Sequence, residues 1–193
     1  MASETDCINE ALGLIGASRI SGLDEDSINA RHALTFYAPT RDALLRMHHW
    51  NFATGRAALS ASTTAPLFEF TYAYPLPEEC LKVREYNGVP VTYAGQYPSR
   101  YTVEGRSILT NDTTVLIVYT ARVTDLTRWD ALAYQVLMTW LASKLAQAIP
   151  KDQKKSAELL QVAMNMLLPS ALAADGQEGT VQALISDSLT WGR

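Results

Sequence analysis

The segment Phe68–Val83 constrains the fold more than any other part of this chain. Its sequence, FEFTYAYPLPEECLKV, alternates aromatic or apolar residues with polar ones, breaks at two prolines and resumes as a second strand-like run. Such alternation is typical of strands with one buried face. Residues 24–52 before it and 127–148 after it repeat apolar residues at helical spacing. The sequence therefore predicts an α+β fold in which a small β-unit is inserted into a helical body.

The predicted insert spans about residues 67–121 and forms one small antiparallel β-sheet. Asn87-Gly88 and Gly105 are turn signals, because glycine and asparagine tolerate positive φ. The run Val115–Tyr119 is almost entirely apolar, which favours a central strand. The preceding stretch, Gly55–Ala65, consists mostly of small residues and is expected to be a connection of little core value. The strands are expected at residues 67–72, 80–86, 89–94, 101–104, 107–110 and 114–121.

The helical body is predicted to be an antiparallel bundle of four helices. Pro39 and Pro169 should kink or fray the helices that contain them, because proline lacks the backbone donor. Three tryptophans lie on the apolar faces and are expected to be largely buried: Trp50, Trp129 and Trp140. The helices are expected at about residues 5–15, 24–52, 127–148 and 152–172.

The helical pattern stops after Ala174, so residues 1–174 are predicted to form the domain and residues 175–193 an extended C-terminal arm. A polar segment with apolar residues only at intervals cannot bury enough surface to fold alone. Tryptophan is also a frequent interface anchor. We expect the arm to order on a partner, with packing back onto its own bundle as the alternative. The residues expected to make the contact are Val181, Leu184, Ile185, Leu189, Trp191 and Arg193.

Composition limits the possible partners. The chain has 193 residues and a net charge of −4, so it is not built to hold nucleic acid through bulk charge. Its two cysteines, Cys7 and Cys80, sit in apolar patterns and are expected to be buried free thiols. The polar N-terminus does not resemble a signal peptide, and no apolar run approaches ~18 residues. No membrane contact is expected.

The sequence indicates neither catalysis nor a cofactor or metal. His48-His49 are adjacent, and adjacent helical residues point about 100° apart, so they are poorly placed to share one ion. They are better interpreted as complementing the dipole at a helix end. Glu78-Glu79 follow Pro77 and are interpreted as solvated turn residues rather than a paired-carboxylate site. The glycines are scattered and form no phosphate-binding loop.

Several segments, taken in order, resemble the head-to-tail adaptor proteins of phages, called tail tubular protein A in short-tailed phages. INEALGLIGASRISGLDEDSINARHA and RDALLRMHHWNFA resemble the N-terminal half of that family. YAYPLPEECLKV, VEGRSILTN and VYTARVTD resemble its β-insert. Each motif alone is mostly caps, turns and core residues, but their order is specific. The resemblance covers residues 6 to about 148.

The resemblance implies a structural protein of the virion neck, assembled in the host cytoplasm and without catalytic residues. Such adaptors form a ring with copies of themselves, usually twelve-fold, beneath the portal protein. The ring extends the channel through which genomic DNA passes as cargo, and it supports the tail nozzle or other tail proteins. The arm residues Val181–Arg193 would then bind the portal. Two alternatives remain: an assembly or binding module of host or prophage origin without catalysis, and a small-molecule binder that uses the β-insert.

Overall fold

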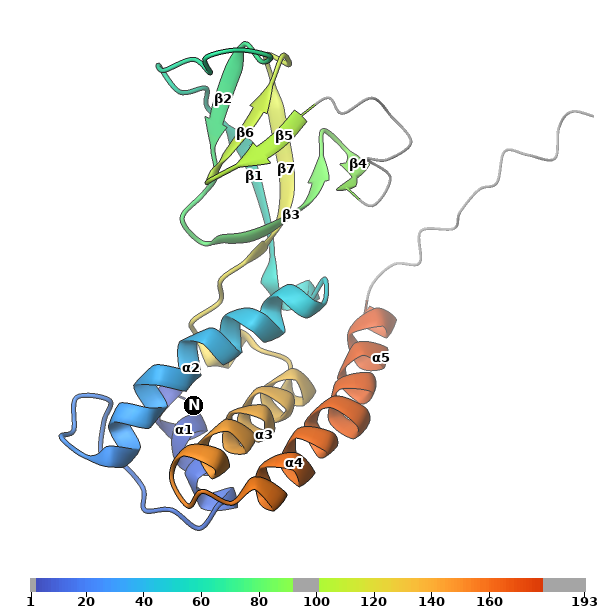
Figure 1. The fold of residues 1–193 in the computed structure, drawn as a ribbon. Coiled ribbons are helices and arrows are strands. Elements are labelled where there is room, and N and C mark those ends of the chain that lie inside the picture. The colour runs from blue at the N-terminus through green and yellow to red at the C-terminus, as the bar shows by residue number, and fades with distance from the viewer. Residues whose placement is uncertain (1–2, 92–100, 179–193) are drawn as a thin grey trace, which may run out of the picture.

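The computed structural model describes residues 3–91 and 101–178, and within them the chain has an α+β fold. A helical lobe and a smaller β lobe lie end to end (Figure 1). The β lobe is inserted between the second and third helices, as the sequence predicted. Two connecting segments join the lobes: one leads from α2 to β1, and the other returns from β7 to α3.

The helical lobe begins with a well-capped helix. Ser3 and Asp6 form a capping box in which each side chain accepts a hydrogen bond from the other's backbone N–H. Asp130 caps α3 by accepting from the N–H groups of Leu132 and Ala133. The helical elements are α1 (Glu4–Leu14), α2 (Ile28–Met47), α3 (Ala131–Ala148), α4 (Gln153–Val162) and α5 (Leu168–Glu178), with short 3-10 turns at Asn51–Ala53 and Leu126–Arg128 and a π-helical turn at Ala163–Leu167.

Helix α3 is the centre of this lobe, because α1, α2, α4 and α5 all pack against it. Leu137, Leu141 and Leu145 are completely buried there. Trp50 and Trp129 are buried as predicted, and Phe52 stacks between their rings. Trp140 is partly buried against this core, and the Lys144 ammonium lies 4.8 Å from its ring centroid. Trp140 therefore belongs to the edge of the core.

Helix α2 is shorter than the predicted span 24–52. Its cap is Ser27, and the acidic residues before that position form a turn instead of a first helical turn. Pro39 produces no break in the helix. The Thr40 hydroxyl, next to the proline, donates a hydrogen bond to the Phe36 carbonyl at 2.6 Å. The helix ends at Met47 because His48 adopts an extended conformation.

The last helix runs further than predicted. α4, the π-helical turn and α5 are continuous, and Pro169 lies within the helix rather than fraying its end. The π-helical turn, in which the Leu168 N–H bonds to the Ala163 carbonyl, widens the backbone just before the proline and accommodates it. The predicted arm boundary at Asp175 was also wrong, because residues 175–178 belong to α5 and Asp175 is buried.

The β lobe consists of two antiparallel sheets instead of the single sheet predicted. One has the strand order β1-β7-β3-β4 and the other β2-β6-β5. Strand β7 is central in its sheet, as the apolar run 115–119 predicted. The strands are β1 (Thr54–Leu59), β2 (Tyr72–Pro75), β3 (Cys80–Tyr86), β4 (Val89–Pro90), β5 (Tyr101–Glu104), β6 (Ser107–Thr110) and β7 (Val115–Ala121).

Two strand predictions failed at the start of this lobe. Residues 54–59, expected to lie mostly in a connection, form β1 and pair with β7. Gly55 makes this possible, because a Cβ there would stand 2.5 Å from the ring of Tyr119. Residues 67–71, expected to be a strand, form a loop instead, with Leu67 and Phe68 exposed. Of the predicted strand 89–94, Val89–Pro90 form β4, and residues 92–94 lie outside the described part.

The remaining turn predictions were confirmed. Asn87 and Gly88 have φ values of 47° and 80° and connect β3 to β4, as the Asn-Gly signal requires. Gly105 has a φ of 56° and connects β5 to β6. The two sheets enclose a separate small core, to which Tyr74 and Ile108 come from one sheet and Val83 and Ile117 from the other. Each lobe thus has its own core.

Candidate interaction surfaces

The residues predicted to bind a partner, Val181, Leu184, Ile185, Leu189, Trp191 and Arg193, lie outside the described residues. The structure therefore does not show whether they come together. It does describe the helix from which they emerge, α5, and the way in which that helix is attached to the rest of the molecule.

The end of α5 is fixed by Asp175, which the sequence analysis had assigned to the arm. Its buried carboxylate accepts a hydrogen bond from the Asn51 backbone N–H at 2.9 Å and lies 3.1 Å from His48 Nε2. The Asn51 side-chain amide donates to the Asp175 carbonyl at 2.7 Å. We call these three residues the α5 latch. It attaches the end of α5 to the point where the chain leaves α2 for the β lobe.

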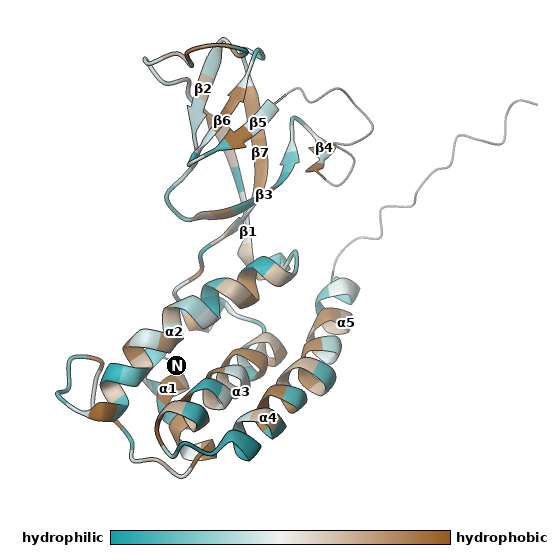
Figure 2. Ribbon diagram, viewed as in Figure 1, coloured by the Kyte–Doolittle hydropathy of each residue, from teal (hydrophilic) through white to brown (hydrophobic). Residues whose placement is uncertain are grey.

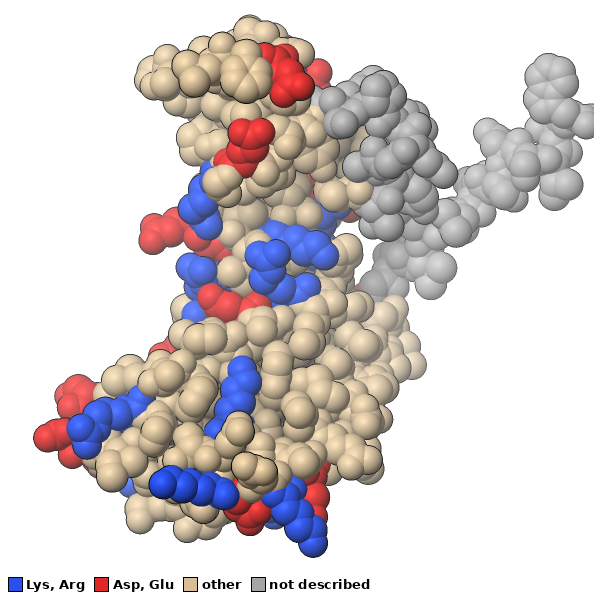
Figure 3. Space-filling view, in the orientation of Figure 1, with Lys and Arg blue, Asp and Glu red and all other residues tan. Residues whose placement is uncertain are grey.

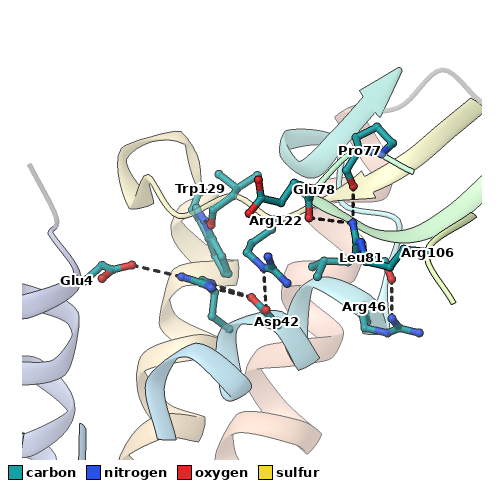
Figure 4. Close-up of polar contacts among 11 residues, drawn as sticks. Glu4, Asp42, Arg46, Pro77, Glu78, Leu81, Arg106, Arg122 and Trp129 are labelled. Carbon is teal, nitrogen blue, oxygen red and sulfur yellow. Dashed lines mark hydrogen bonds and ion pairs between the residues drawn. The ribbon is translucent and has the colours of Figure 1, made fainter. Parts of the chain in front are cut away.

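A chain of charged groups lies at the junction between the two lobes (Figure 4). Asp42 of α2 accepts from the Arg41 and Arg122 guanidinium groups, each at 2.9 Å. Arg41 also contacts Glu4 of α1 at 3.3 Å. Arg41 is buried, whereas its partners are partly exposed. The group therefore fixes the returning chain after β7 against α1 and α2.

Backbone carbonyls of the β lobe accept hydrogen bonds from two further arginines. Arg46 of α2 donates to the Leu81 carbonyl, and Arg106 donates to those of Pro77 and Glu78 (Figure 4). Lys and Arg side chains gather at this waist in Figure 3. Burial lowers the pKa of Arg84, and burial together with Arg84 and Lys82 lowers the pKa of His49. The waist is therefore basic, although the chain as a whole is acidic.

The histidine and glutamate pairs are not brought together into a metal or catalytic site. His48 belongs to the latch, whereas His49 is exposed. Glu79 accepts from the Tyr119 hydroxyl at 2.7 Å, and this bond lowers the pKa of its carboxyl. Within residues 3–91 and 101–178, no group of three or more His, Cys, Asp or Glu side chains could hold a metal ion. Both cysteines are free and buried, as predicted, and burial raises the pKa of Cys7 to about 12.

Exposed apolar residues mark two further surfaces. Leu67 and Phe68, at 97% and 77% exposure, lie on the loop before β2. The continuous helix Gln153–Glu178 is, by length and composition, apolar enough to cross a membrane, and only 17% of its most apolar window is buried. The sequence analysis did not anticipate such a segment, because the expected helix was shorter and ended near Pro169. Apolar residues recur along α4 and α5 in Figure 2.

Comparison with known proteins gives no identification: no family model matches the chain, and a search of curated proteins finds no matching relative. The candidate surfaces are therefore defined by geometry alone. Sequence reasoning missed Asp175 because an aspartate near a helix end is usually solvated. The sequence gives no signal for it, because Gly176 follows Asp175 directly and glycine disfavours a continuing helix.

Proposed function

We propose that this chain is a structural virion protein, a head-to-tail adaptor. In this role it assembles as a ring under the portal, extends the DNA channel and provides the attachment platform for the tail. The passing DNA is cargo and not a ligand. Its site of action is the virion neck, after assembly in the host cytoplasm.

One observation carries the proposal. The segments that resemble the adaptor family are far apart in sequence, yet two of them meet at the lobe junction. Arg41 and Asp42 begin the segment 41–53, and Arg122 lies in the segment 118–125. Asp42 binds both arginines at 2.9 Å. The resemblance thus includes residues that hold a β lobe on a helical body, which is the arrangement the family implies.

The α5 latch supports the assignment of the C-terminal arm to portal binding. Because Asp175 holds the end of α5 at the junction, the residues that follow Glu178 leave from a fixed point. A tether that starts at a fixed point searches a smaller volume and binds a neighbouring partner at a higher effective concentration. The arm residues Val181, Leu184, Ile185, Leu189, Trp191 and Arg193 remain the proposed contact.

The test uses the portal ring of the virus proposed to carry this chain. A chain truncated after Glu178 keeps the whole latch, so its melting temperature should match that of the full chain. We expect it to lose co-elution with the portal ring in size-exclusion chromatography. The matched control is Ser188→Ala, which changes an arm residue outside the proposed contact and should retain binding. Truncated chain that co-elutes like the full chain would contradict the arm assignment.

The small-molecule alternative receives no support from the described cavity. A cavity of about 440 Å³ is lined by Phe36, Lys144, Gln147 and Ala148. These residues belong to α2 and α3 of the helical lobe, not to the β-insert. We therefore put forward no second function.

A further inference from the structure

We infer that copies of this chain associate head-to-tail through two different surfaces of the helical lobe. The exposed side of α4–α5, here called the strip, packs on the next copy's groove between α2 and the C-terminal half of α3. This inference deepens the proposed adaptor role by naming the surfaces through which copies meet. Its test uses this chain alone, so it can fail while the portal test succeeds, and the reverse.

The strip is the larger of the two surfaces. Leu160, Val162 and Met166 are 43%, 38% and 65% exposed. Between Glu158 and Asp175 the helix carries no charged residue. An uncharged helical surface of this length is costly to leave in water and is typical of an interface. Methionine at its centre adapts to irregular partners.

The groove is concave and has an apolar wall. Phe36 from α2 and Ala148 from α3 line its cavity of about 440 Å³, with Lys144 and Gln147 at its edge. Pro39 and Met47 on α2 are also exposed, and Trp140 on α3 is partly exposed. A cavity of this volume is large enough to receive a side chain of the size of Met166, which is the most exposed of the three residues of the strip named above.

Strip and groove lie on different sides of α3, so one molecule does not cover its own groove with its own strip. In Figure 1, α2 is on one side of α3 and α4–α5 is on the other. Both α2 and the α4–α5 helix pack directly on α3. A molecule with two unlike complementary surfaces joins its neighbours heterologously, whereas a two-fold dimer needs one self-complementary surface.

The distribution of charged residues favours a second copy of this chain as the partner of the strip and of the groove. Helix α2 begins next to Asp24 and Asp26, and α4 begins next to Lys151 and Lys154, all four exposed. Both helices run from the base of the lobe toward the junction, so these clusters lie at the same end (Figure 1). Figure 3 shows acidic side chains at the turn before α2 and basic ones along the base.

When two copies lie side by side in the same orientation, the start of one copy's α4 contacts the start of the next copy's α2. Lys151 and Lys154 at the start of α4 then face Asp24 and Asp26 before α2, which steers the two surfaces into register. A lipid bilayer could neutralise these lysines through its phosphate groups, but it offers no partner for the aspartates before α2 or for the groove. A second copy of the chain offers a partner to each of these features.

The experiment introduces one charge into each surface of the full chain. Met166→Asp damages the strip and leaves the groove intact. Ala148→Arg fills the groove and leaves the strip intact, and a cation near the end of α3 suits the helix dipole. Ala131→Asp, exposed in the first turn of α3, is the control for adding a charge. Circular dichroism and thermal melting check that each variant is folded.

Mass is then measured by light scattering after size-exclusion chromatography. Wild type and Ala131→Asp should form concentration-dependent oligomers, and Met166→Asp and Ala148→Arg should each be monomeric. An equimolar mixture of those two variants should form 1:1 dimers and nothing larger, because one intact strip and one intact groove remain. Lys154→Glu should weaken wild-type association about tenfold, and adding Asp24→Lys should restore it.

Three results would overturn the inference. The first is wild-type chain that stays monomeric at about 1 mM, the weak end of specific association. The second is a mixture of the two variants that stays monomeric, or a single variant that dimerises by itself. The third is flotation of the wild type, but not of Met166→Asp, with phosphatidylcholine vesicles, which would assign the strip to a bilayer.

Discussion

The two lobes are stabilised in different ways. Among the described residues, 24 form the buried core of the helical lobe, most of them aliphatic, but only eight form that of the β lobe. Three of those eight are tyrosines, Tyr74, Tyr86 and Tyr119, whose hydroxyls bond to polar groups at the rim. Because hydrophobic free energy follows buried apolar area, the helical lobe should carry most of the stability. The β lobe depends more on close fits and polar bonds.

The largest effect should come from the helical core. Leu137 is completely buried at the centre of α3, so Leu137→Ala should lower the free energy of unfolding by about 2–5 kcal/mol. Urea denaturation followed by far-UV circular dichroism measures this. Leu160→Ala, on the exposed strip, is the matched control and should change stability by less than about 0.5 kcal/mol. Equal losses in both variants would show that the core is not centred on α3.

The α5 latch should have an intermediate effect. Asp175→Ala leaves the Asn51 N–H without its acceptor and removes the partner of His48, which should cost about 1–3 kcal/mol. Asp175→Asn retains a side-chain carbonyl that can accept from Asn51 and should cost less. Glu178→Ala, three residues further and exposed, is the control. Hydrogen exchange at α5 amides should rise in the Ala variant alone; unchanged exchange there would contradict the latch.

In the β lobe, the tightest fit is between β1 and β7. Gly55→Ala would place a Cβ 2.5 Å from the Tyr119 ring, which must move out of the small core. Overpacking of this kind should cost about 1–3 kcal/mol. Gly13→Ala, in α1 with open space around it, should be neutral or stabilising. If Gly55→Ala is as stable as wild type, the close approach of β1 to Tyr119 is wrong.

The smallest effect concerns a rim bond. The Tyr119 hydroxyl lowers the pKa of Glu79 below its ordinary value of 4.5. A lowered folded-state pKa stabilises the fold above that ordinary value, and this contribution is lost as the pH falls through the folded pKa. Glu79 is exposed, so the contribution should be less than about 0.5 kcal/mol. The difference in stability between Glu79→Gln and wild type at pH 7 should therefore shrink as the pH falls below 4.5; a difference that stays the same size throughout an acid titration would exclude this origin.

The sequence predicted the helical lobe better than the β lobe, for physical reasons. Helix α3 packs on every neighbouring helix, so residues 131–148 form a long, predominantly apolar run, and the length of this run is the signal that indicates a buried helix. Strand β1 leaves no such signal. Its residues TGRAAL are small because Tyr119 covers them, and small residues also occur in loops. Conversely, residues 67–71 alternate like a strand, yet no neighbouring strand pairs with them.

The candidate surfaces were less predictable than the fold. The strip exists because a π-helical turn joins α4 and α5 into one continuous helix. This helix contains Pro169, where the sequence predicted a kink or a frayed end. The latch depends on contacts between residues more than a hundred positions apart, such as Asn51 and Asp175. Local patterns contain no information about such pairs. The predicted portal-binding residues of the arm lie outside the described part, so that prediction stands untested.

Imaging the portal ring by electron microscopy after incubation with excess chain tests the adaptor proposal most directly. The account predicts an additional ring coaxial with the portal, in which each copy's α4–α5 strip faces the next copy's α2–α3 groove. The Met166→Asp variant should decorate the portal without forming a closed ring. Portal particles that remain bare at saturating concentrations of wild-type chain would contradict the account.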